Sequence, residues 1–116
     1  MPLNNDKHGI IYGELVNILG SDYVSDDLGV LQAYTRGFYA ASVLRSRMPE
    51  FVVLPSSTED VQLVLRLANR YQFPFSVMGS GLTFPFIAAT RPYWCIVDTK
   101  RMGYLEIDEK NMYAIV

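Results

Sequence analysis

The sequence predicts an α+β protein of α/β-like type, in which N-terminal helices precede a β–α–β unit and further strands. Two short apolar runs, FVVL at 51–54 and FSVM at 75–78, flank a stretch with helical periodicity. A strand, a helix and a second strand in this order are typical of a parallel sheet with a right-handed crossover. The later apolar runs predict that further strands follow this unit.

Two helices are expected before the first strand. Residues 1–7 are polar and should form a frayed tail, and a helix is predicted over 9–19, before Gly20. Its apolar stripe consists of Ile11, Leu15, Ile18 and Leu19. Ser25 is a suitable N-cap for a short second helix. Its inward-facing residues are expected to be Leu28, Leu31 and Tyr34.

The central strand and helix carry clear boundary signals. The strand at 51–54 does not alternate between apolar and polar residues, so both its faces should be covered. Pro55 ends it, and Ser56 with Glu59 has capping-box spacing, with Ser57 as a second candidate cap. The core stripe of the helix, which is expected to end near residue 71, is predicted to be Val61, Val64, Leu65 and Ala68.

The C-terminal third is expected to hold short strands joined by one long loop. Residues 75–78 form the second strand, and the prolines at 85 and 92 predict a loop over 79–92. Strands are predicted at 94–98, 104–107 and 112–116. Because the last strand is apolar to its end, we expect the chain to be a piece of a longer protein or to pair this strand with a partner.

Composition excludes several classes of function. The net charge of -2 and the scattered basic residues do not suit a nucleic-acid-binding surface. The single cysteine, Cys95, and the single histidine, His8, cannot form a structural zinc site and make a catalytic triad a poor candidate. No apolar run approaches the roughly 20 residues of a membrane span, and the N-terminus lacks a signal-peptide pattern. The expected location is the cytoplasm.

The glycine turn, GSGLT at 79–83, is the main candidate site. It lacks the third glycine of the dinucleotide fingerprint, and Pro85 blocks the helix that this fingerprint requires. The lysine of a Walker loop is also absent. Two interpretations remain, an ordinary turn and an anion nest whose backbone N–H groups converge on phosphate oxygens.

Three segments follow one another along the chain: FVVLPSSTEDVQLVLRLANRYQFPFSVMGSG, IVDTKRM and LEIDEKNMYAIV. Together they resemble the FAD-linked oxidase family of the vanillyl-alcohol oxidase and p-cresol methylhydroxylase type. The branch most similar to them is the glycolate oxidase catalytic subunit. The resemblance implies that 50–116 is the first lobe of an FAD-binding domain and that 1–49 is an N-terminal helical segment. It also implies that the rest of that domain and the substrate-cap domain are missing, so that the fragment alone would be inactive.

The resemblance implies a site and partners as well. The residues near the FAD pyrophosphate would be Pro55, Met78, Gly79, Ser80, Gly81, Leu82 and Thr83. Met78 stands where the family often has arginine, and the absence of histidine between 79 and 92 implies that FAD is bound non-covalently. The full-length protein would oxidise a 2-hydroxy acid and pass electrons to an iron–sulfur or electron-transfer subunit. The alternative is a non-catalytic domain that pairs with a partner or forms a homodimer through its edge strand.

The remaining chemically notable side chains are interpreted as structural. Asp98 and Arg101 are expected to form a local ion pair or cap, and Cys95 to be a small buried hydrophobe. Core packing is also expected for the aromatic residues Phe73, Phe75, Phe84, Phe86, Tyr93 and Trp94. No residue is identified as a general base.

Overall fold

The structure is a computed structural model that describes residues 2–35, 48–80 and 91–116. Its elements in chain order are α1 (Pro2–Leu19), the 3-10 turn η1 (Ser21–Tyr23), β1 (Val24–Ser25), α2 (Leu28–Thr35), β2 (Phe51–Val53), α4 (Thr58–Tyr71), β3 (Phe75–Met78), β4 (Cys95–Asp98), β5 (Glu106–Asp108) and β6 (Tyr113–Ile115). The mixture of helices and parallel strands confirms the predicted fold class.

The main sheet has the strand order β1-β2-β4-β3. Strands β2, β4 and β3 are parallel, and β1 pairs antiparallel with β2. The two strands of the predicted β–α–β unit, β2 and β3, are therefore not neighbours, because β4 lies between them. This central position explains why all four residues of β4 are buried.

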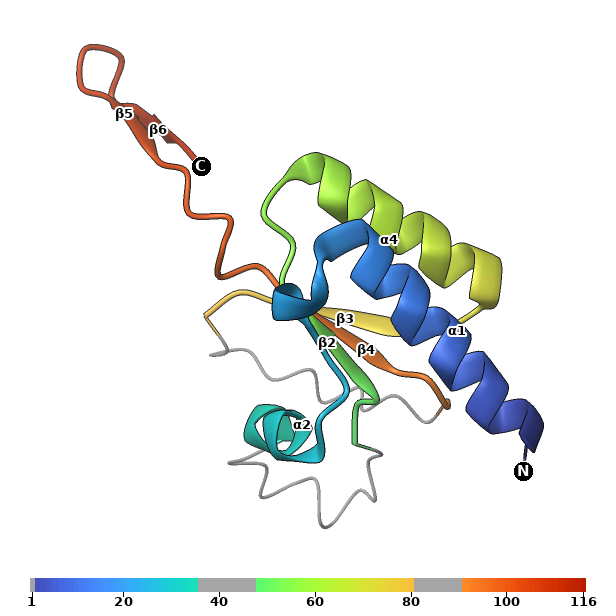
Figure 1. The fold of residues 1–116 in the computed structure, drawn as a ribbon. Coiled ribbons are helices and arrows are strands. Elements are labelled where there is room, and N and C mark those ends of the chain that lie inside the picture. The colour runs from blue at the N-terminus through green and yellow to red at the C-terminus, as the bar shows by residue number, and fades with distance from the viewer. Residues whose placement is uncertain (1, 36–47, 81–90) are drawn as a thin grey trace.

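Helices cover both faces of this sheet (Figure 1). Helices α1 and α4 lie side by side on one face, and α2 lies on the opposite face. Alternate strand residues point to opposite faces, so Phe51 and Val53 join the cluster under α1 and α4, whereas Val52 joins the cluster under α2. The non-alternating run at 51–54 is thus explained by burial on both sides, as predicted.

Helix α1 is longer than predicted, since it begins at Pro2 and not near Gly9. Proline is tolerated in the first turn of a helix, where its missing N–H would have no partner. Tertiary contacts hold the end of the segment expected to be a frayed tail: Lys7 Nζ lies 4.8 Å from the Tyr93 ring centroid. The next residue, His8, stacks on Phe51 with centroids 4.7 Å apart.

The start of α2 also differs from the prediction. Ser25 belongs to β1, and the Asp27 carboxylate accepts a 3.2 Å hydrogen bond from the Val30 N–H at the first turn of the helix. Leu31 is buried and Tyr34 half-buried, but Leu28, which was expected to face inward, is 61% exposed. The helix begins later than predicted because β1 uses Val24 and Ser25 for pairing with β2.

Helix α4 confirms the predicted extent, while its cap and stripe are shifted. Ser57, the second candidate, is the N-cap and accepts a hydrogen bond from the Asp60 N–H. The Asp60 carboxylate reaches back to the N–H and hydroxyl of Ser56, so Asp60 takes the role predicted for Glu59. The buried residues of this helix are Val64, Leu67 and Ala68, whereas Leu65, which was predicted to be buried, is 37% exposed.

The β5–β6 hairpin projects away from the helices and the main sheet (Figure 1). Its turn is closed by Asn111, whose backbone N–H and side-chain amide both donate to the Asp108 carboxylate. Almost all residues from 102 to 116 are exposed. Among the described residues, no helix has the length and apolar character needed to cross a membrane.

Candidate functional site

The candidate site lies at the carboxyl edge of the parallel strands. Since β2, β4 and β3 run in the same direction, the segments that follow them emerge at the same edge. Leu54 and Pro55 follow β2, Gly79 and Ser80 follow β3, and Thr99 follows β4. In open α/β sheets this edge is where ligands bind.

Four of the seven predicted site residues fall within the described chain. Pro55 is fully buried, Met78 is half-buried, and Gly79 and Ser80 are exposed. The structure thus brings Pro55 and the first residues of the glycine turn to one edge, on either side of β4. The remaining predicted contacts, Gly81, Leu82 and Thr83, lie outside the described residues.

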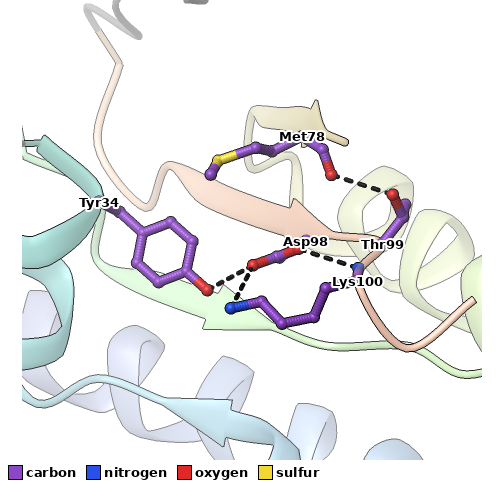
Figure 2. Close-up of polar contacts among 5 residues, drawn as sticks. All are labelled: Tyr34, Met78, Asp98, Thr99 and Lys100. Atoms are coloured by element: carbon purple, nitrogen blue, oxygen red, sulfur yellow. Dashed lines mark hydrogen bonds and ion pairs between the residues drawn. The ribbon is translucent and has the colours of Figure 1, made fainter. Parts of the chain in front are cut away.

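Met78 contributes its backbone to this edge, because its side chain packs into the core under α2, against the cluster that contains Val52, Trp94 and Ile96. The Met78 carbonyl accepts two hydrogen bonds from Thr99, each of 3.0 Å. One comes from the backbone N–H, and the other comes from Oγ1 (Figure 2). An arginine side chain at this position would have to leave water for an apolar cluster.

The end of β2 is held in a comparable way. A guanidinium N–H of Arg101 donates a 2.7 Å hydrogen bond to the Leu54 carbonyl, immediately before Pro55. The guanidinium carbon lies 3.3 Å from the centroid of the Tyr23 ring, a cation–π distance. The turn after β4 therefore contacts the ends of both neighbouring strands.

Asp98 is the buried polar residue of this edge, with 1% of its surface exposed. Its carboxylate accepts a 2.5 Å hydrogen bond from the Tyr34 hydroxyl, a 3.0 Å bond from the Lys100 N–H, and lies 3.1 Å from Lys100 Nζ (Figure 2). The expected ion pair between Asp98 and Arg101 does not form, because Arg101 is directed to the Leu54 carbonyl. The alternative expectation, a local cap, agrees with the bond from the Lys100 N–H to Asp98. Buried carboxylates need such partners to offset lost hydration.

This environment shifts two pKa values near Asp98. Burial, followed by the hydrogen bond to Asp98, raises the pKa of Tyr34 above its ordinary value. The hydrogen bond to Asp98 raises the pKa of Lys100. At neutral pH Tyr34 is therefore a neutral donor and Lys100 a cation, and both stabilise the carboxylate.

Cys95 lies in structural surroundings, as expected, whereas His8, which was expected in a polar tail, packs against the sheet. Cys95 is fully buried in the middle strand, and this burial raises the pKa of its thiol, so it is an inert hydrophobe. His8 stacks on Phe51 at the opposite, amino end of β2 and has Asp26 at 4.0 Å. Within the described ranges, no group of three or more histidine, cysteine or acidic residues could hold a metal ion.

The sequence profile of the family described as FAD binding domain matches residues 49–116, which is more than half of the chain. The chain belongs to the FAD binding domain family. Its strand order and carboxyl-edge segments are thus those of a domain whose cofactor is FAD. Within the described residues, a Cβ placed at Gly79 would meet no atom within 4 Å, so a phosphate could approach this backbone without a side chain in the way.

Individual relatives agree with this assignment. A D-lactate dehydrogenase from Archaeoglobus fulgidus is 33% identical over 64 residues, which cover 55% of this chain and 14% of that protein. A structure of p-cresol methylhydroxylase with bound substrate superposes with a TM-score of 0.77 at 23% identity, covering 94% of this chain and 22% of the other. A 4-ethylphenol oxidase from Gulosibacter chungangensis gives a TM-score of 0.72 at 28% identity, covering 94% and 21%.

These matches show the fold of the p-cresol methylhydroxylase-type FAD-binding domain, as predicted. The chain spans between one seventh and one quarter of the length of these relatives. Sequence reasoning did not foresee the role of Thr99 at the edge, nor that Tyr34 would reach Asp98. The IVDTKRM segment did signal that this turn belongs to the FAD-binding domain, although it could not show which backbone groups the turn contacts.

Proposed function

We propose that this chain is the lobe that binds the FAD pyrophosphate in an FAD-dependent oxidoreductase of 2-hydroxy acids. The observation that carries the proposal is the position of Gly79 and Ser80: they follow β3 at the carboxyl edge of a sheet that belongs to the FAD binding domain family. Backbone N–H groups in such a position converge on anions without a side chain in the way.

In this proposal the chain's own residues bind and orient the cofactor. The turn from Gly79 through Gly81 and Leu82 presents N–H groups, while Ser80 and Thr83 add hydroxyl donors. Pro55 forms a rigid apolar boundary at the end of β2. Attachment is non-covalent, since no histidine lies between 79 and 92. The division into an N-terminal helical segment, 1–49, and an FAD-binding lobe, 50–116, is part of the same proposal.

The substrate class is proposed from the relative that is 33% identical, a D-lactate dehydrogenase. FAD, when bound, accepts the two electrons released when a 2-hydroxy acid is oxidised to the 2-oxo acid. The glycolate oxidase-like branch implies that these electrons pass to an iron–sulfur or electron-transfer subunit. This lobe would hold the phosphates in place during the reaction, and the lobe alone would not turn over substrate.

The cofactor proposal is tested by titrating the purified chain with FAD and following flavin fluorescence. Gly79→Ala should weaken binding because its methyl group occupies the space that the phosphate approaches. Gly103→Ala is the matched control, since a Cβ at either glycine meets no atom within 4 Å and neither is marked by a positive φ. Equal affinities of the parent chain and Gly79→Ala would contradict the proposed site, and absence of FAD binding would overturn the proposed function.

The substrate proposal needs a protein of the relatives' length that begins with this chain. Under anaerobic conditions, D-lactate or glycolate should bleach its flavin absorbance near 450 nm, whereas 4-methylphenol should not. The phenol serves as the comparison because two of the structural relatives act on or are named for phenols. Bleaching by the phenol alone would reject the 2-hydroxy acid as substrate and leave FAD binding intact.

A second candidate function, self-association through a strand edge, is favoured by the exposed hairpin. All three residues of β6 are exposed, and the flanking Met112 and Val116 are exposed by 88% and 93%. Unpaired, apolar strand edges tend to pair with another chain. Light scattering on the chain over a range of concentrations decides the matter: a dimer that Ile115→Lys dissociates would support it, and a strict monomer would refute it.

A further inference from the structure

We propose that Thr99 and Arg101 are positioning residues, which fix the backbone at the two points where the chain enters the cofactor site. This inference rests on the proposed function, since it concerns the same glycine turn. It adds that the turn after β4, residues 99–102, determines in which direction the first N–H group of the site points. The argument starts from the Met78 carbonyl.

The Met78 carbonyl is held by two donors on one residue, the Thr99 N–H and the Thr99 Oγ1 hydroxyl, each at 3.0 Å. The first bond continues the parallel pairing of β3 with β4, in which Met78 lies opposite Asp98. The hydroxyl adds a second bond to the same oxygen, so both of its lone pairs are used. This carbonyl is therefore directed at β4 more firmly than strand pairing alone would require.

Fixing this carbonyl also fixes the next N–H group. The peptide between Met78 and Gly79 is planar and trans, so the Gly79 N–H points in the direction opposite to the Met78 carbonyl. It is thus directed away from β4, towards the side of β3 that carries no neighbouring strand in the described part of the main sheet. A donor in that direction is available to a ligand rather than to the sheet.

Arg101 fixes the backbone carbonyl at the second point where the chain enters the site, the end of β2. Its guanidinium donates to the Leu54 carbonyl at 2.7 Å, and the peptide that contains this carbonyl leads directly into Pro55. Stacking on Tyr23 holds the guanidinium plane in place. Pro55 and Gly79 follow different strands, but their preceding carbonyls are both bound by one short turn.

The turn itself is held rigidly. The Thr99 carbonyl accepts a 2.9 Å hydrogen bond from the Met102 N–H, and Asp98 Oδ1 accepts one of 3.0 Å from the Lys100 N–H. Asp98 is anchored in turn by the Tyr34 hydroxyl from α2 (Figure 2). A chain of contacts thus leads from α2 through Asp98 and Thr99 to the Met78 carbonyl.

The test compares Thr99→Val, which is similar in shape but lacks the hydroxyl, with Thr99→Ser, which retains it. Ser76→Ala is the matched control: it removes the hydrogen bond that Ser76 Oγ accepts from Trp94 Nε1, on the same strand β3 and two residues before Met78. Each variant is titrated with ADP, which carries the pyrophosphate, and with adenosine, which does not. The amide resonances of Gly79, Ser80 and the residue at position 99 are followed by NMR.

We expect Thr99→Val to weaken ADP binding about two- to tenfold, the size of one lost hydrogen bond. Without ligand it should accelerate exchange of the backbone amide at position 99, which donates to the Met78 carbonyl. Thr99→Ser should restore both properties, and Ser76→Ala should change neither. If Thr99→Val binds ADP as the parent chain does, or if Ser76→Ala weakens it equally, the positioning role is rejected. A parent chain that binds no ADP would overturn the proposed function, whereas exchange of the amide at position 99 would still decide whether the Thr99 hydroxyl fixes this backbone.

Discussion

Tyr34 and Asp98 lie 64 positions apart, yet the Tyr34 hydroxyl donates a 2.5 Å hydrogen bond to the Asp98 carboxylate. This bond joins α2 to the end of the central strand β4, beside the proposed cofactor site. The carboxylate is almost completely buried and has Lys100 as its other side-chain partner. Loss of the tyrosine would therefore leave a buried charge with one donor fewer.

The first prediction concerns this hydrogen bond. Tyr34→Phe should lower the free energy of unfolding by about 1.5–3 kcal/mol, the range for hydrogen bonds to charged groups. Urea denaturation measures the change. Tyr104→Phe is the matched control, since it removes an exposed tyrosine hydroxyl that bonds Glu106, and should change stability by less than about 0.5 kcal/mol. Equal effects of the two substitutions would show that burial of Asp98 does not increase the contribution of its hydrogen bond to stability.

The second prediction concerns alkaline pH. Burial and the bond to Asp98 raise the folded-state pKa of Tyr34 above 10.0. A raised pKa contributes stability that is complete below the unfolded pKa and is lost as pH rises through the folded pKa. The free energy of unfolding should therefore fall from about pH 10 upwards, and the fall should be smaller in Tyr34→Phe. Urea midpoints between pH 8 and 11 measure this pH dependence. If stability falls with pH equally steeply in the parent chain and in Tyr34→Phe, the prediction is contradicted.

The third prediction tests whether the N-terminal helix and the sheet unfold together. Ile11 is fully buried in the same cluster as Phe51 and Val64, whereas its neighbour Ile10 is 50% exposed. Ile11→Ala should cost about 2–5 kcal/mol, and Ile10→Ala less than about 1 kcal/mol. Trp94 fluorescence, which reports on the opposite face of the sheet, should detect the same transition as circular dichroism. Separate transitions would mean that 1–49 and 50–116 are independent units.

The fourth prediction concerns the thiol. Because Cys95 is fully buried and burial raises its thiol pKa, an aromatic disulfide reagent should label it only when the chain opens. In native buffer labelling should be slow and should accelerate with urea, in parallel with unfolding. The urea-unfolded chain, labelled within seconds, is the control. Rapid labelling of the native chain would place Cys95 at the surface, contrary to the structure.

The local elements were predictable because their signals are local. The strand β3 has the predicted bounds, since proline precedes it and glycine follows. Helix α4 ends as predicted at Tyr71, where Gln72 adopts a left-handed conformation. Cys95 is buried, as an apolar neighbourhood in the sequence indicated. The glycine turn and its flanking segments indicated the FAD-binding family, because a backbone phosphate site depends on residue types that stand close together in the chain.

The sequence by itself thus determined the class of fold, most elements and the cofactor family. Only the tertiary structure decided that β4 lies between β2 and β3, that Asp98 pairs with Tyr34 and Lys100 rather than Arg101, and that Thr99 holds the Met78 carbonyl. The physical reason is the same in each case. Periodicity, caps and turns depend on neighbours along the chain, whereas strand order and hydrogen-bond partners depend on which distant segments meet when the core is buried.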